Sequence, residues 1–205
     1  MELLVKKDFS KAAAAVQEVT NNNLFARSVI EHKVTGQVYV NDKDNPTTFY
    51  IVHPYGMTLL LGDSTNKEFN EQFRKHALNI TSSRDNYEWM QAFPNSWDNV
   101  LSELFDGYMI KAADNKQATE KGIIELNTRV NFKFNREKYP ALHQRITDPA
   151  IEIVQADRNL FRKMKGSVIP ASFWENEDVF FENGLAYCLL YKQQLASTAF
   201  SSCWF

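Results

Sequence analysis

The stretch GLAYCLLYKQQLASTAFSSCWF, residues 184–205, carries the strongest fold signal in the chain. Residues 185–191 form an apolar run of strand length, and residues 195–205 form a second run beyond a polar break. We predict two neighbouring strands of one sheet. The first is apolar on both sides of the pleat, which is typical of a central strand covered on both faces. The second runs into Trp204 and Phe205 with no turn residue or charge after it, which is not how a buried sheet ends.

Composition sets the broad class of the protein. The chain has 205 residues, of which 44% are hydrophobic and 23% charged, as in a soluble globular protein of one large or two small domains. The net charge is -2 and the basic residues are scattered, which argues against a nucleic-acid partner. The amino terminus lacks the pattern of a signal peptide and no apolar run reaches transmembrane length, so we expect a cytoplasmic protein without a membrane partner.

The first two thirds of the chain alternate between helical and strand periodicity. Strand-like runs cover residues 36–41, 47–53 and 57–61, and we interpret them as an antiparallel meander. Two further strands are predicted at 87–92 and, from strict alternation of apolar and polar residues, at 124–134. Helices are predicted at residues 8–19, 24–31, 65–79 and 96–105. Asp8 or Ser10 is expected to cap the first of them, and Thr65 with Glu68 to form a capping box on the third.

A domain boundary is predicted in residues 135–149, which contain two prolines and many charges. We divide the chain into an N-terminal α/β domain, residues 1–140, and a second domain, residues 141–205. The second domain begins with a strand at 151–154 and a helix capped by Asp157. Ser172 and Glu175 have the spacing of a capping box for another helix, and the two strands of residues 184–205 follow. The fold class is therefore α+β or mixed α/β.

The order of elements after the boundary resembles a known superfamily. FWENEDVF at 173–180 leads into GLAYCLL at 184–190 and LASTAFS at 195–201, and this series is similar to the GNAT superfamily of N-acetyltransferases. Upstream, NPT at 45–47, LGD at 61–63 and RVNF at 129–132 are similar to the bacterial two-domain acetyltransferase-like group. The resemblance implies an antiparallel-sheet-plus-helices domain followed by the first half of a GNAT mixed sheet. The link KQQ at 192–194 departs from the pattern, because it lacks the Gly or Asn expected at a tight turn.

The resemblance also implies a reaction. Acetyl-CoA would be the cosubstrate, and a small-molecule or peptide amine would attack its thioester directly, without a covalent enzyme intermediate. In the family a fourth strand and a glycine-rich turn follow and hold the pyrophosphate at a helix start. The seven glycines, at 36, 56, 62, 107, 122, 166 and 184, contain no such cluster. We therefore expect no cofactor-binding residue within residues 1–205 and assign no catalytic residue.

Three residues are candidates for the acceptor side. In the GNAT fold the link between the first two helices borders the acceptor pocket, and the resemblance places Trp174 and Glu175 there. An aromatic wall and a carboxylate would suit a cationic amine. The ordinary alternative is that Phe173 and Trp174 fix this helix onto the sheet. Ser197, on the second of the two strands, is a further candidate.

Other reactive residue types are assigned to structure. Cys188 lies in an all-apolar strand and is expected to be a reduced core residue. The histidines, at 32, 53, 76 and 143, have no metal-ligand spacing, so we expect no metal site. His76 is expected at the edge of the apolar stripe of its helix.

Two further hypotheses stay open on the sequence. The first is a non-catalytic ligand-binding or interaction module whose GNAT portion is vestigial. The second concerns association: an open edge at Trp204 and Phe205 would favour strand pairing or a homo-oligomer through the C-terminal edge of the sheet.

Overall fold

The computed structural model describes residues 1–82, 84–111, 122–130, 132–138, 148–166 and 168–202. Its contacts divide the chain into two units, Met1–Thr128 and Arg129–Phe205, hereafter unit 1 and unit 2. The boundary predicted between residues 140 and 141 falls in residues 139–147, outside the described residues, as do His143 and the terminal residues 203–205.

Unit 1 is built on a five-stranded sheet in the order β1-β2-β3-β4-β5. The strands are β1 (Glu2–Leu3), β2 (Gln37–Val40), β3 (Thr48–Val52), β4 (Met57–Gly62) and β5 (Trp89–Phe93). The antiparallel meander predicted for β2, β3 and β4 is confirmed. β5 pairs with β4 in parallel, because the chain returns through helix α3 (Lys67–Ala77) before β5 begins. The sheet is therefore mixed.

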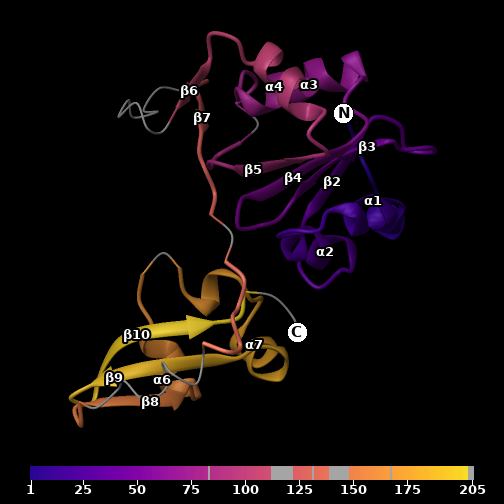
Figure 1. The fold of residues 1–205 in the computed structure, drawn as a ribbon. Coiled ribbons are helices and arrows are strands. Elements are labelled where there is room, and N and C mark those ends of the chain that lie inside the picture. The colour runs from indigo at the N-terminus through magenta and orange to yellow at the C-terminus, as the bar shows by residue number, and fades with distance from the viewer. Residues whose placement is uncertain (83, 112–121, 131, 139–147, 167, 203–205) are drawn as a thin grey trace. The chain divides into compact units, whose positions relative to one another are not determined.

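Helices cover both faces of this sheet (Figure 1). The 3-10 helix η1 (Lys6–Ala12), α1 (Ala13–Glu18) and α2 (Leu24–Ile30) pack on one face, and α3 and α4 (Trp97–Leu104) pack on the other. Successive residues of the central strands consequently point into different cores: Ile51 and Leu61 face α1 and α2, whereas Tyr50 and Leu60 face α3. This double burial explains why β3 and β4 are continuous apolar runs.

Three of the predicted helix caps are wrong, and the fourth is confirmed. Neither Asp8 nor Ser10 caps the first helix, which begins as η1 after Val5 without a side-chain cap. α3 is capped by Asn66, whose Oδ1 accepts a hydrogen bond from the Phe69 amide at 2.9 Å. α7 (Glu177–Asn183) is likewise capped by Asn176 and not by Ser172. In both cases an asparagine stands directly before the first helical residue, where its side chain reaches the orphan amides. Asp157 caps α6 (Arg158–Lys163) as predicted, accepting from the Leu160 amide at 2.7 Å.

The long strand predicted at residues 124–134 is only partly present. β7 (Ile124–Leu126) pairs in parallel with β6 (Met109–Lys111), and the described residues 127–130 and 132–134 form no strand. Val130 is 67% exposed and Phe132 is 92% exposed, so the predicted dry face is wrong here. Alternation alone does not make a strand, since a strand also needs a neighbour to satisfy its backbone.

Unit 2 contains a three-stranded antiparallel sheet in the order β10-β9-β8. The strands are β8 (Ile151–Gln155), β9 (Ala186–Tyr191) and β10 (Gln194–Phe200), and η3 (Pro170–Ser172) lies between α6 and α7. Both strands predicted from residues 184–205 are present and β9 is central, but the second strand ends at Phe200 and not at the predicted residue 205: Ser201 and Ser202 are not in a strand, and residues 203–205 lie outside the described residues. Lys192 and Gln193 make the tight turn between β9 and β10 with φ of 49° and 65°, without the expected glycine. Among the described strands, β10 pairs with β9 alone, so its outer edge has no described neighbour.

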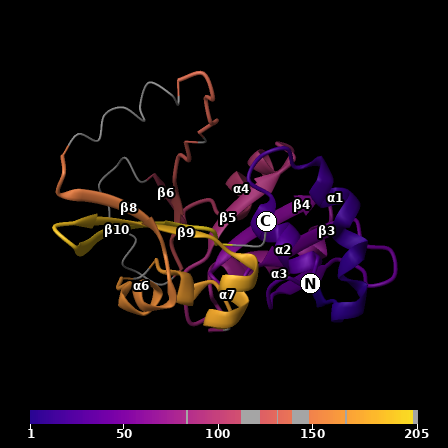
Figure 2. The ribbon, with the colours of Figure 1, turned by 90° about the horizontal axis from the view of Figure 1, so that it is seen from below.

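One face of this sheet carries both helices, α6 and α7 (Figure 2). Ala186 and Cys188 of β9 are buried against them. On the opposite face Tyr187 and Tyr191 remain 47% and 44% exposed. The prediction that β9 is covered on both faces is therefore wrong for the described residues, although its position between two strands is as predicted.

Candidate functional site

The α6–α7 side of the unit 2 sheet holds the first of the predicted acceptor residues. Trp174 is 7% exposed, and its Nε1 donates a hydrogen bond to the Ser201 carbonyl oxygen at 2.8 Å. Its ring meets Phe180 edge to face at 5.6 Å between centroids. The indole of Trp174 therefore joins the start of α7 to the end of β10 and is part of the core of unit 2.

The other two candidates lie elsewhere. Glu175 follows Trp174 and is exposed to solvent. Ser197 is exposed on β10 and stands opposite Leu189, whose neighbours Tyr187 and Tyr191 belong to the face without helices. The structure thus brings neither Glu175 nor Ser197 against the buried Trp174 ring.

A hollow of about 300 Å³ lies between the end of α6 and the first half of β10. Its lining residues come from two short segments: Lys163, Met164 and Lys165, and Leu195, Ala196, Ser197 and Thr198. The strand is irregular at this point, because the β9–β10 register shifts between Leu195 and Ser197 and leaves Ala196 without a partner. A bulge of this kind re-aims side chains and is frequent beside binding sites.

The bulge decides which hydroxyl faces the helices. Thr198 stands opposite Cys188, which is fully buried under α6 and α7. Side chains of directly opposed residues share one face of a sheet, so Thr198 points to the helix side. Thr198, Lys163 and Lys165 were not predicted as site residues. The sequence signal is faint: two lysines directly at and after the end of a short helix.

Cys188 is a core residue, as predicted. Its side chain is buried, and burial, followed by the nearby charge of Asp157, raises the pKa of its thiol. A thiol that stays protonated in an apolar layer is a poor nucleophile. Among the described residues no group of histidine, cysteine and acidic side chains could hold a metal ion.

Unit 1 contains a buried polar cluster that the sequence did not reveal. The carboxylate of Glu88, just before β5, accepts a hydrogen bond from the Tyr50 hydroxyl at 2.5 Å and lies 3.1 Å from His76 Nε2. Arg84 reaches the same carboxylate at 3.8 Å and donates to the carbonyl oxygens of His76 and Ala77 at the end of α3. The cluster joins β3, α3 and the segment before β5.

The electrostatics of this cluster favour a charged Glu88. Burial raises the pKa of its carboxyl, but the hydrogen bonds from His76 and Tyr50 and the charge of Arg84 hold the pKa below its usual value. Tyr50 is almost fully buried, so burial and the Glu88 charge raise the pKa of its hydroxyl well above 10. Every group of the cluster is paired inside unit 1, which is the arrangement of a structural network.

The fold of this chain is similar to that of a solved protein structure. A solved structure of a GCN5-related N-acetyltransferase-like protein from Streptococcus suis matches with a TM-score of 0.61 and 14% sequence identity. The match covers 97% of this chain and 72% of that chain. At this identity it shows the fold alone. A search of the curated proteins found no match.

A protein-family model that matches the sequence shows the family. The model described as GNAT acetyltransferase matches residues 14–205, nearly the whole chain. This protein belongs to the GNAT acetyltransferase family, and the resemblance expected from residues 173–201 is confirmed.

The family generally uses acetyl-CoA, whose pyrophosphate requires converging backbone amides. The described residues contain no glycine-rich turn: the two glycines nearest to each other in the sequence are Gly56, in the turn between β3 and β4, and Gly62, the last residue of β4. In addition, no helix among the described residues is long and apolar enough to cross a membrane.

Proposed function

We propose that this protein transfers an acetyl group from acetyl-CoA to an amine. The supporting observation is the order β8, α6, α7, β9, β10 in unit 2, which matches the start of the GNAT fold, together with the family match over residues 14–205. The residues of this chain would serve the acceptor side, since the hollow beside α6 and β10 is lined by polar groups.

The chemistry that these residues can supply is orientation of the acceptor. The strand β10 holds the hydroxyls of Ser197 and Thr198, whereas Lys163 and Lys165 are exposed at and just after the end of α6 and reach the hollow through flexible side chains. Cys188 takes no part, because its thiol is buried and protonated. No covalent enzyme intermediate is expected.

The test combines binding and turnover on the full-length protein. Acetyl-CoA at a hundred times its dissociation constant should add about 2.7 kcal/mol to the stability of the folded state, measured as a thermal shift. A panel of amines is then screened for release of the free thiol of coenzyme A. ATP at the same concentration is the control for binding of any adenine nucleotide.

The two readouts separate the enzyme from the alternative module. A thermal shift with thiol release for at least one amine supports the proposal. A shift without thiol release for any amine would favour a non-catalytic binding protein, and no shift at saturating acetyl-CoA would refute the proposed donor.

A further inference from the structure

The basic residues of α6 and of the segment after it have two different surroundings. Arg158 and Arg162 are neutralised: Arg158 Nη1 lies 2.9 Å from Glu177 Oε1 and 2.7 Å from Asp178 Oδ1, and Arg162 Nε lies 2.9 Å from Glu177 Oε2. These pairs tie α6 to the start of α7. The two carboxylates balance the charges of the two guanidinium groups, so the arginines already have anionic partners within unit 2.

Lys163 and Lys165 differ from the arginines. Both are exposed, both line the hollow, and within the described part of the chain neither makes an ion pair or a side-chain hydrogen bond. Thr198, on the opposite wall, has no hydrogen-bond partner for its hydroxyl in the same residues. The hollow is therefore bordered by two ammonium groups and by the hydroxyls of Ser197 and Thr198, all with open donor capacity within the described residues.

None of the described residues that line the hollow is acidic. Glu177 and Asp178, the acids of the neighbouring helix start, are engaged with the arginines, and the pKa of Glu177 is lowered by its hydrogen bonds to Arg162 and Arg158. The charged residues of the described lining, Lys163 and Lys165, are therefore both positive. A cationic group would be repelled there, whereas an anionic oxygen group would gain two charge-assisted hydrogen bonds.

We propose that the hollow binds an anionic group, a carboxylate or a phosphate, carried by the acceptor amine. This inference rests on the proposed acetyl transfer and specifies its substrate class: an amine that bears an acidic group at one end. It differs from the cationic acceptor expected from Glu175, because Glu175 does not line the hollow.

Lys163 and Lys165 act as positioning residues in this assignment. They hold the acid end of the substrate and leave its amine free to reach the donor. Because both lysines are exposed, their attraction is screened by salt, and binding should weaken as ionic strength rises.

Binding is tested first, without any acetyl donor. Inorganic phosphate and glutarate are titrated separately into the full-length protein at low salt, and the backbone amide signals of residues 195–198 are followed by NMR. We expect a saturable shift with at least one of the two anions, and the tighter one identifies the group. The Lys163→Gln/Lys165→Gln double variant should bind at least five-fold more weakly.

A matched control separates a built site from general positive charge. Lys192→Gln removes an exposed lysine of the same unit, in the β9–β10 turn and outside the hollow. It should change the affinity less than two-fold. Equal weakening by Lys192→Gln, or shifts that do not saturate with either anion, would overturn the anion site.

Turnover then tests the substrate role and keeps it apart from the proposed function. Acceptors are compared in pairs that differ only in an acid and its amide, such as β-alanine and β-alaninamide. The inference expects a lower KM for the acid and loss of that preference in the double lysine variant, with kcat changed less. Equal turnover of both members would overturn the inference while acetyl transfer stands. Saturable anion binding without any turnover would refute the proposed function and leave the anion site.

Discussion

The two sheets of this protein show the same kind of sequence in two different environments. β3 of unit 1 and β9 of unit 2 are both apolar on both sides of the pleat and both lie between two strands. In β3, Tyr50 and Ile51 are 1% and 0% exposed, because helices cover both faces. In β9, Cys188 is fully buried whereas Tyr187 is 47% exposed.

The two units also differ in how their polar side chains are paired. Unit 1 places its large side chains and even its charged Glu88 in closed layers, where every polar group of the cluster is paired. In the described part of unit 2, helices cover one face of the sheet, and a hollow contains unpaired donors.

The largest expected effect is the loss of a core tryptophan in unit 1. Trp97 is fully buried on the α4 side of the sheet, and its Nε1 donates to the Gly62 carbonyl oxygen at 3.2 Å. Trp97→Ala should lower the free energy of unfolding of unit 1 by about 4 kcal/mol, because it opens a cavity and leaves that carbonyl unpaired. Hydrogen exchange of the β3 and β4 amides measures the change within this unit.

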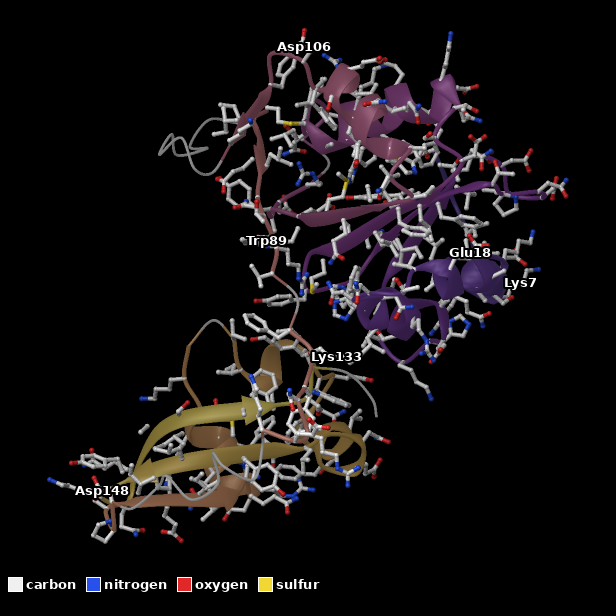
Figure 3. All side chains as sticks on the ribbon, viewed as in Figure 1. Lys7, Glu18, Trp89, Asp106, Lys133 and Asp148 are labelled. Atoms are coloured by element: carbon white, nitrogen blue, oxygen red, sulfur yellow. The ribbon has the colours of Figure 1, made fainter. Side chains whose placement is uncertain are left out.

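Trp89 provides the control for this substitution. It lies at the start of β5 (Figure 3). The residue is 64% exposed. Trp89→Ala should lower the free energy of unfolding of unit 1, measured by hydrogen exchange of the same β3 and β4 amides, by less than about 0.5 kcal/mol. Comparable losses of stability for Trp97→Ala and Trp89→Ala would contradict the conclusion that the buried layers of unit 1 carry its stability.

The second prediction concerns pH. His53 directly follows β3 and is buried, 3% exposed, and its Nδ1 accepts a hydrogen bond from the Tyr55 amide at 3.1 Å. Burial lowers the pKa of His53 from 6.5 to about 4. The unfolded chain therefore binds a proton at a higher pH than the folded chain, and stability falls as the pH drops from 6.5 to 4. The loss should reach about 3 kcal/mol in unit 1.

The His53→Asn variant isolates this contribution. The asparagine oxygen can accept the Tyr55 amide in place of Nδ1, but it does not titrate. Urea unfolding at pH 7 and pH 4.5 should show a smaller acid loss for the variant than for the natural chain. If both chains lose the same stability, His53 is not the group responsible.

The smallest expected effect is in unit 2. Trp174→Phe keeps an aromatic ring against Phe180 but removes the N–H that donates to the Ser201 carbonyl oxygen. We expect a loss of about 1 kcal/mol, measured by hydrogen exchange of the β9 and β10 amides. Tyr187→Phe, on the exposed face, should lower the stability measured at these amides much less. A loss as large as that of Trp97→Ala would mean that unit 2 is as tightly packed as unit 1.

The sequence predicted most elements because their signals are local. Apolar runs identified β2, β3, β4, β9 and β10, and the Asp157 cap identified α6. The predictions that depended on neighbours were less successful. Residues 127–130 and 132–134 alternate like a strand but have no described partner, and the second face of β9 lacks a described cover.

The candidate site was only partly accessible to sequence reasoning. The Trp174 region was located through the family resemblance, but burial and the bond to Ser201 were not visible in the sequence. Lys163, Lys165 and Thr198 are ordinary surface residue types and carry no motif. They become a group only because a bulge at Ala196 turns Thr198 toward the end of α6.

The sequence by itself determined the family, the order of most strands and helices, and the core character of Cys188, because each of these depends on residue type and short-range periodicity. The tertiary structure decided which faces are covered, which charges are neutralised and where open donors meet. Glu88 and His76 are twelve residues apart, and Arg158 and Glu177 are nineteen apart. Such pairings arise from packing between elements, and packing is a property of the folded chain.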